Sequence, residues 1–224
     1  MNYISVAIDG PSGAGKSTLA RQAAEKLGYL YVDTGAIYRT VALSAVRSGI
    51  DPADAQRLIP TLEKLDIRLD YGADGLQHMY LNGEDVSMAI REHAISQHAS
   101  TVSAIPQVRA FLLELQRSLA RNNNVIMDGR DIGTVVLPEA QVKLFLTAAP
   151  EARAARRHLE LCQRGQDTPF ETVLQDIVRR DEQDTNRPIA PLRQAEDAVL
   201  VDTTHLDLEQ SLQAILSAIK EKIK

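Results

Sequence analysis

Short apolar runs rich in valine and isoleucine alternate along the chain with longer stretches whose apolar positions recur at the period of a helix. The runs that stand out as strands cover residues 3–8, 29–32, 124–127, 142–146 and 198–201. The helical patterns cover residues 16–27, 36–48, 107–121, 151–164, 170–184 and 208–223. Because the strand-like runs are mostly apolar at every position, we expect both of their faces to be covered. The pattern predicts an α/β protein with a five-stranded parallel sheet and helices on both faces.

One region breaks this alternation. Residues 66–87 carry two turn signals, Gly-Ala-Asp-Gly and Asn-Gly, between short strand-like runs. Asn-Gly between strands is typical of a tight hairpin. We therefore expect a small antiparallel sheet, within a subdomain inserted at about residues 52–103 of a single domain that spans 1–224.

Length and composition narrow the class of protein. The 224 residues suffice for one core and a small appended subdomain. A net charge of -5 argues against a protein that coats nucleic acid. The single cysteine, Cys162, excludes an internal disulfide, and no stretch resembles a signal peptide or reaches the ~20 apolar residues of a membrane span. We expect a cytoplasmic protein that has neither a nucleic acid polymer nor a membrane as a partner.

A glycine-rich segment, GPSGAGKS at 10–17, follows the first predicted strand and precedes a helical pattern. It fits G-x-x-x-x-G-K-[ST], a loop whose backbone N–H groups surround nucleotide phosphates. Lys16 would reach the β- and γ-phosphates, and the hydroxyl of Ser17 could coordinate Mg2+. A plain turn would need neither side chain at this spacing. The residues expected to bind the nucleotide are Gly10, Pro11, Ser12, Gly13, Ala14, Gly15, Lys16, Ser17 and Thr18.

A phosphate loop alone does not separate a switch GTPase, a motor ATPase and a kinase of small molecules. The D-x-x-G and N-K-x-D patterns of GTPases are absent from the sequence, and an oligomeric ATPase would usually be longer. Three other segments combine arginine with short carboxylates near predicted element ends, where ligands of open α/β sheets bind. They are DTGAIYR (33–39), DGRDIG (128–133) and RDEQDTNR (180–187). We therefore predict a P-loop NTPase-type fold that serves a small-molecule kinase.

Two of these segments follow predicted strands, and each allows a second interpretation. In the first, Thr34 could cap the next helix and offer its hydroxyl to an anion, with Arg39 on the second helical turn. The alternative is a plain cap and a solvated arginine. In the second, Asp128 closes a strand just before Arg130 and Asp131, and the alternative to a binding site is a surface ion pair.

Two helical stretches also carry arginine on one face. The first set comprises Arg180, Asp184 and Arg187, for which the alternative is a solvated charged face. The second set comprises Arg153, Arg156 and Arg157, with Arg164 beyond. A basic lid over transferring phosphates would have this second pattern. A solvated helix whose arginines pair with Glu151 and Glu160 would have it equally.

Four segments, in their order and spacing, resemble those of bacterial cytidylate kinases, a family of nucleoside monophosphate kinases: IDGPSGAGKST, DTGAIYR, DGRDIGTVVLPEA and RDEQDTNRPIAPL. The likeness spans nearly the whole chain. An adenylate kinase would have D-G-[FY]-P-R where this chain has DGRD, and a thymidylate kinase would have D-R-[FYHW], which is absent from the sequence. The resemblance implies that the inserted region binds the acceptor monophosphate, and we expect a helical lid at about residues 151–168.

The resemblance also implies roles for individual residues. Those expected to bind the acceptor nucleotide are Asp33, Thr34, Arg39, Ser100, Arg109, Arg130, Asp131, Arg180, Asp184 and Arg187. Among these, Ser100, Arg109 and Asp131 would read the base, since a carboxylate accepts from the amino group of cytosine and an arginine donates to its ring acceptors. The residues expected to act in catalysis are Lys16, Arg130, Arg157 and Asp128.

The implied activity is phosphotransfer from ATP, with Mg2+, to the phosphate group of CMP or dCMP, by a monomer. Two alternatives remain open from the residues alone. One is a kinase of another acceptor, such as UMP, and the other is a nucleotide-binding switch.

Overall fold

The computed structural model describes residues 3–72, 76–163 and 165–223. Contacts between Cα atoms divide the chain into two compact units. The first unit comprises Met1–Tyr31 and Ala120–Lys224, and the second comprises Val32–Leu119. Each unit is described below by itself.

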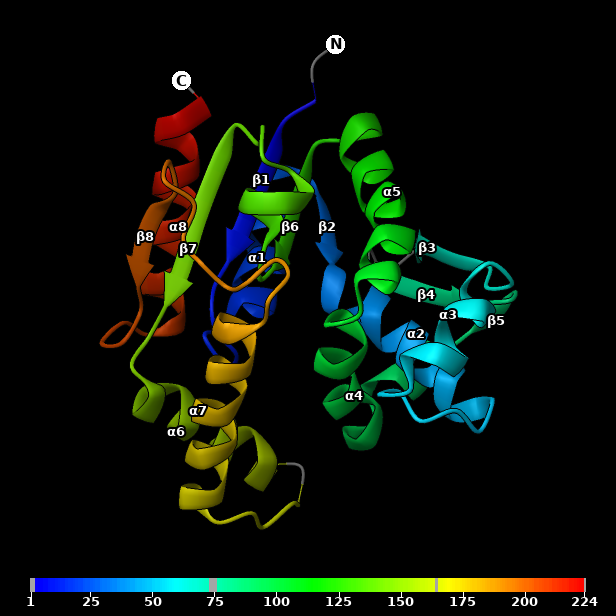
Figure 1. Cartoon of the computed structure of the whole chain (residues 1–224). Helices are drawn as coiled ribbons and strands as arrows, with labels where there is room; N and C mark the ends of the chain where they lie inside the picture. Colours follow the sequence, from blue (N-terminus) through cyan, green and yellow to red (C-terminus); the bar gives the residue numbers. More distant parts are fainter. Residues whose placement is uncertain (1–2, 73–75, 164, 224) are drawn as a thin grey trace. The chain divides into compact units, whose positions relative to one another are not determined.

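A five-stranded sheet, ordered β2-β6-β1-β7-β8, is the centre of the first unit (Figure 1). Its strands are β1 (Ser5–Asp9), β2 (Leu30–Asp33), whose last two residues belong to the second unit, β6 (Val125–Gly129), β7 (Val142–Thr147) and β8 (Val199–Asp202). All five predicted strands are confirmed, with ends that move by one or two residues. The parallel register sets Asp9 beside Gly129 on β6 and beside Phe145 on β7. The carboxyl ends of these strands therefore lie together, where ligands of such sheets bind.

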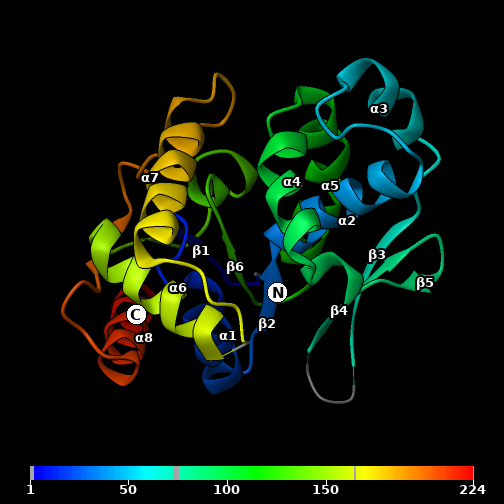
Figure 2. The same ribbon diagram turned by 90° about the horizontal axis from the view of Figure 1, so that it is seen from below.

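Helices flank this sheet, as the sequence predicted. Helices α1 (Lys16–Leu27) and α8 (Leu208–Ile223) share one buried apolar cluster with strands β1, β6, β7 and β8. Helices α6 (Pro150–Gln163) and α7 (Phe170–Asn186) lie side by side in both views (Figure 2). They are joined by a small apolar cluster that includes Leu161 and Ile177. A single turn of π-helix, Ile132–Val136, follows β6 directly.

The second unit holds the predicted antiparallel sheet, formed by β3 (Ile67–Tyr71), β4 (Gln77–Leu81) and β5 (Glu84–Asp85) in that order (Figure 2). The Asn-Gly signal is confirmed as the two-residue turn between β4 and β5, because Asn82 and Gly83 have φ angles of 52° and 85°. The other turn signal, Gly-Ala-Asp-Gly, falls largely on residues 73–75, outside the described residues.

Helices make up the rest of the second unit. They are α2 (Thr34–Arg47), α3 (Ala55–Leu62), η1 (Ala89–Arg91), α4 (His93–Ser103) and α5 (Pro106–Asn122), whose last residues belong to the first unit. The sequence pattern predicted α2 and α5 and missed α3 and α4. A proline lies inside α3, and α4 is rich in serine, threonine and histidine, which are weak helix formers. Across the described residues, none of the helices combines the length and apolar character needed to cross a membrane.

Candidate active site

The loop from Gly10 to Ser17 joins β1 to α1 in the first unit, and its backbone depends on glycine. Gly10, Gly13 and Gly15 have φ angles of 151°, 74° and 84°, which residues other than glycine rarely adopt. A Cβ at Gly10 would lie 1.9 Å from the carbonyl oxygen of Leu146 on β7. The loop thus leads directly into the amino end of α1, whose backbone N–H groups and dipole attract anions.

Lys16 is buried next to this loop, with only 6% of its surface exposed. Its ammonium donates to the carbonyl oxygen of Pro11 at 2.7 Å. Burial, and then repulsion by Arg130, lowers the pKa of Lys16 to about 7, against the opposing effect of Asp128 and neighbouring acids. Lys16 and Arg130 therefore lie close enough to interact, and together they would favour an anion between them.

Asp128, at the end of β6, is buried and receives two hydroxyl groups. Ser17 donates to its Oδ2 at 2.8 Å, and Tyr31 donates to its Oδ1 at 3.0 Å. The sequence singled out Ser17 and Asp128 but not Tyr31. A tyrosine in an otherwise apolar strand was a possible signal, because a buried phenol usually needs a hydrogen-bond partner.

A group of arginines from α6, α7 and the segment just after β6 lies in the same unit. Arg130 donates through Nε to Asp184 Oδ2 at 2.7 Å. Burial lowers the pKa of Arg180, and repulsion by Arg130 and Arg157 lowers it further, against attraction by Asp184. Like charges held this close destabilise a fold unless an anion compensates them. The arrangement is thus suited to binding phosphate.

The adjacent pair Arg187 and Asp131 links the end of α7 to the turn after β6. Arg187 donates through Nη2 to Asp131 Oδ1 at 3.3 Å and through Nε to the carbonyl oxygen of Ala190 at 2.6 Å.

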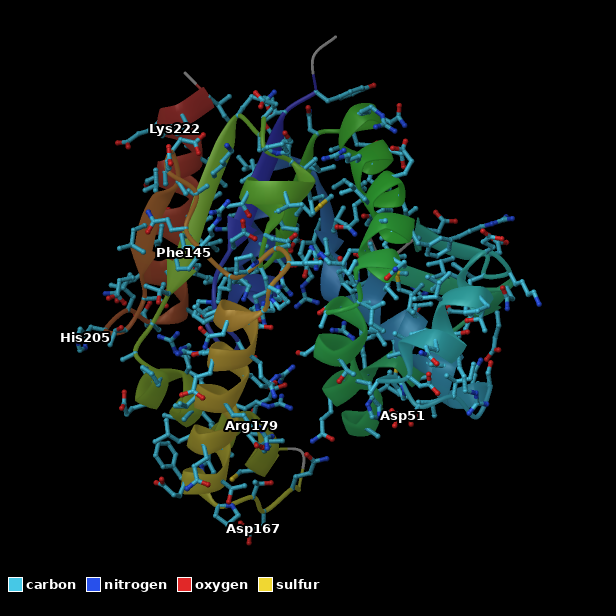
Figure 3. All side chains as sticks on the ribbon, in the orientation of Figure 1. Asp51, Phe145, Asp167, Arg179, His205 and Lys222 are labelled. Carbon is cyan, nitrogen blue, oxygen red and sulfur yellow. The ribbon has the colours of Figure 1, made fainter. Side chains whose placement is uncertain are left out.

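Arg179, labelled on α7 in Figure 3, behaves differently from its neighbour Arg180: it is exposed and pairs with Asp176 at 2.7 Å. The structure therefore places a solvated and a half-buried arginine next to each other on α7.

Neither interpretation of the α6 arginines, a basic lid or a solvated face, holds for Arg153. This residue is 3% exposed and donates to the carbonyl oxygens of Ala148 and Ser12 and to Asp181. Arg156 donates to the carbonyl oxygen of Thr203 after β8. Both arginines anchor α6 to neighbouring loops, because a guanidinium group can satisfy several carbonyl oxygens at once.

The other α6 arginines fit the earlier expectations in part. Arg157 pairs with Glu160 at 2.7 Å, as the solvated alternative expected, and it also acts on Arg180 electrostatically. Arg164 lies outside the described residues.

In the second unit, Asp33 rather than Thr34 caps α2, which corrects the sequence-based expectation. The Asp33 carboxylate accepts from the N–H of Ala36 at 2.9 Å and from Arg39 Nη2 at 2.9 Å. Thr34 is the buried first residue of the helix. Both residue types cap helices well, so the sequence alone could not choose between neighbours.

The Arg39 guanidinium pairs with Asp33 through Nη2 but leaves a second donor unused. Its Nε is buried and has no hydrogen-bond partner among the residues that the structure describes. Gln77 on β4, which the sequence did not single out, fixes the backbone of Asp33: Oε1 accepts from its N–H at 2.8 Å and Nε2 donates to its carbonyl oxygen at 3.3 Å. The unsatisfied Nε is a donor that an anionic ligand could use.

Arg109 and Ser100 lie on α5 and α4 of the same unit. Arg109 is buried, stacks over the ring of Tyr38 at 5.7 Å and donates to the carbonyl oxygen of Ser103 at 3.3 Å. The Ser103 hydroxyl in turn donates to the carbonyl oxygen of Ser100 at 3.0 Å. These contacts with Tyr38 and Ser103 help to orient the guanidinium group.

Two groups of predicted residues thus come together, one in each unit. The first unit gathers Lys16, Ser17, Asp128, Arg130, Asp131, Arg157, Arg180, Asp184 and Arg187 around the carboxyl ends of β1 and β6. The second unit joins Asp33 to Arg39 at the start of α2, and connects Arg109 with α2 and the end of α4.

Known proteins resemble this chain over its whole length. The cytidylate kinase family model matches residues 6–221. A cytidylate kinase of Caldicellulosiruptor bescii is 47% identical over 224 residues, which are 100% of this chain and 99% of that protein. A cytidylate kinase of Carboxydothermus hydrogenoformans is 49% identical over 217 residues, or 97% of each protein.

Among solved structures, an uncharacterised protein from Eubacterium ventriosum ATCC 27560 has a TM-score of 0.53 and 11% identity, and the match covers 97% of this chain and 98% of that one. At this identity the likeness concerns the fold alone. The family match and the full-length relatives agree with the phosphate loop and the four motifs. The chain therefore belongs to the cytidylate kinase family.

Proposed function

We propose that this chain transfers the γ-phosphate of ATP to CMP and dCMP, producing ADP and CDP or dCDP. The observation that carries the proposal is the match to cytidylate kinases over residues 6–221. In the proposed reaction, a phosphate oxygen of the acceptor attacks the γ-phosphorus in line with the leaving oxygen of ADP. Because this oxygen is already ionised, the reaction needs no general base. Alignment and neutralisation of charge supply the catalysis.

On the donor side, we assign the ATP phosphates to the backbone N–H groups of residues 10 and 12–18 and to Lys16. The fixed glycine conformations and the start of α1 support this assignment. We assign Arg130 and Arg157 to the charge that develops on the transferred phosphate. Both repel the nearby Arg180, and this gathering of cations, which is costly without an anion, supports that role.

The oxygen atoms of Ser17 and Asp128 fit Mg2+, which prefers hard oxygen ligands and takes few of them from protein. When bound, the ion would neutralise phosphate charge. In this proposal Tyr31 orients the Asp128 carboxylate through its hydrogen bond to Oδ1. Asp128 thus contributes to catalysis as a ligand and not as a base.

On the acceptor side, we assign Thr34, Arg39 and Arg130 to the phosphate of CMP, and Arg180, Asp184 and Arg187 to its ribose and phosphate. The unsatisfied Nε of Arg39 supports its place in this list. Asp33 positions Arg39 in this proposal, because its carboxylate already caps α2 and pairs with that arginine. Ser100, Arg109 and Asp131 would read the cytosine base. We expect the chain to act as a monomer in the cytoplasm, with no nucleic acid polymer as a partner.

The proposed function is tested by measuring ADP formation from ATP with CMP, dCMP, UMP, AMP or GMP as acceptor, and with none. We expect slow turnover without an acceptor and a strong preference for the two cytosine nucleotides. Turnover fastest with UMP or another acceptor would favour the first alternative. ATP consumption that does not depend on any acceptor would contradict a kinase and favour a nucleotide-binding switch.

The lowered pKa of Lys16, about 7, predicts that ATP binding is coupled to proton uptake. At about pH 8 the free protein would hold Lys16 largely neutral, and the phosphates of ATP would restore its charge, so binding should take up about one proton. ATP itself has no proton to release at this pH. Calorimetric titrations in buffers of different ionisation enthalpy measure the uptake. Lys16→Met should abolish it, and equal heats in all buffers for the unaltered protein would contradict the prediction.

A further inference from the structure

The turn that follows Asp131 is capped by a residue from another part of the chain. Asp131 occupies the N-cap position of the π-helical turn Ile132–Val136, and its carbonyl oxygen accepts from Val135 and Val136. A residue at this position usually caps the turn with its own side chain. Within this fully described turn, however, the Asp131 carboxylate makes no capping hydrogen bond and meets Arg187 at 3.3 Å. The first N–H groups of the turn therefore need another acceptor.

Asp9 is that acceptor. It is the last residue of β1, and its side chain is buried, with 4% of the residue exposed. The N–H of Ile132 donates to its Oδ1 at 2.8 Å, and the N–H of Gly133 donates to its Oδ2 at 2.7 Å. Since β1 and β6 are paired with Asp9 beside Gly129, the carboxylate lies next to the strand end from which the turn departs.

Close packing at Gly133 also restricts the turn. A Cβ added to Gly133 would lie 3.2 Å from Cδ of Lys143 and 3.4 Å from Oδ2 of Asp9. Lys143 is itself buried and its ammonium pairs with Asp197 at 2.8 Å. Lys143 and Asp9 thus both pack closely against Gly133, which leaves the turn little freedom to shift toward them.

This arrangement costs energy that a turn built for stability alone could avoid. Burial raises the pKa of Asp9 to about 6, although the two backbone N–H groups oppose the shift, and Asp131 repels the Asp9 charge. If Asp131 capped its own turn, the protein would not need a second buried carboxylate there. What the second carboxylate provides is an Asp131 side chain that faces Arg187 instead of its own backbone.

We propose that Asp9 is a positioning residue for acceptor selectivity, which holds the turn of Asp131 in a fixed position relative to the phosphate loop. Asp9 directly precedes Gly10, the first residue of that loop, so one residue joins the loop that would hold ATP to the turn that would read the acceptor base. The inference rests on the proposed function, in which Asp131 reads cytosine. It adds a residue that contacts neither nucleotide.

The test is Asp9→Asn, which preserves shape but replaces one acceptor oxygen by a donor that faces a backbone N–H. We expect the Asp131 side chain to turn back and cap its own helix. The kcat/KM for CMP should then fall by about tenfold or more, while that for UMP changes little, so the CMP-to-UMP ratio falls by about tenfold. The Kd for ATP, measured by calorimetry, should stay within about threefold, because the phosphate loop keeps its own hydrogen bonds.

Asp207→Asn is the matched control, since Asp207 also accepts a backbone N–H, from Gln210 at 2.8 Å, but is exposed at the start of α8. It should leave the ratio unchanged. Gly133→Ala is the second variant. Its Cβ would crowd the Lys143 side chain at 3.2 Å and push the turn away while Asp9 stays unaltered, so it should lower the ratio in the same direction even if Asp9→Asn does not fold.

Two outcomes separate the inference from the function on which it rests. If the unaltered protein does not prefer CMP to UMP, the proposed function fails. Suppose instead that the unaltered protein prefers CMP. If the variants that fold then lose activity equally with both acceptors, or bind ATP weakly, Asp9 only supports the fold and the inference is overturned.

Discussion

With Lys16 replaced by methionine, turnover of CMP phosphorylation is expected to fall by about 10³-fold, whereas the nucleotide-free protein should become more stable. Methionine has nearly the length of lysine but no charge, so it removes the ammonium without opening a cavity. Lys16 is 6% exposed, and its burial beside Arg130 disfavours the charged form. The positive charge of Lys16 therefore aids phosphoryl transfer but destabilises the nucleotide-free protein.

The stability gain should depend on pH. Burial and Arg130 lower the pKa of Lys16 in the folded state to about 7, below its value of 10.5 in an unfolded chain. Between these pH values the unfolded state therefore binds more protons than the folded state. The free-energy cost of burying Lys16 on folding decreases as the pH rises through this range. Thermal unfolding of both proteins at several pH values measures this, and the advantage of the variant should decrease toward high pH.

The control is Lys26→Met, which removes the same charge from the last turn of the same helix, α1, where the side chain is exposed. It should alter neither turnover nor the stability profile. A loss of less than about tenfold in Lys16→Met would exclude a direct role for this ammonium in the reaction.

The features predicted correctly from sequence are those whose signal is local. The five strands appear as apolar runs, and the phosphate loop appears as a spacing of glycine, lysine and serine between a strand and a helix. The Asn82-Gly83 turn carries its conformation in its two residues. In each case, residues adjacent in the chain determine the structure.

The features that were missed depend on partners distant in the sequence. The pattern on α6 indicated which arginines share a side, but not that Arg153 would meet the carbonyl oxygen of Ser12, 141 residues away. Asp9 lies just beyond the predicted strand at 3–8 with no signal of its own, and its two hydrogen bonds cross 123 and 124 residues. Gln77 and Tyr31 are similar cases, because each orients a predicted residue from another element. Periodicity gives a direction from the helix or strand, whereas the partner depends on tertiary packing.

The second large effect is expected for Gly10→Ala, which should lower the free energy of unfolding by about 3 kcal/mol or more and weaken ATP binding by at least about 10²-fold. The added Cβ would lie 1.9 Å from the carbonyl oxygen and 3.0 Å from the carbonyl carbon of Leu146. These are backbone atoms of β7, so relief requires movement of the loop or the strand. The φ of 151° adds strain of its own. Urea denaturation measures the first effect, and calorimetric titration with ATP measures the second.

Gly28→Ala separates the effect of the close approach from that of glycine conformation alone. Gly28 ends α1 with φ 66°, and a Cβ there would meet nothing within 4 Å. This variant should cost only about 1 kcal/mol and leave ATP affinity unchanged, because it strains the backbone without forcing β7 away from the phosphate loop. If the two variants were equally stable and bound ATP equally well, contact with Leu146 would not determine the shape of the loop. A large difference in ATP affinity would instead show that β7 sets the distance at which the backbone N–H groups of the loop meet the phosphates.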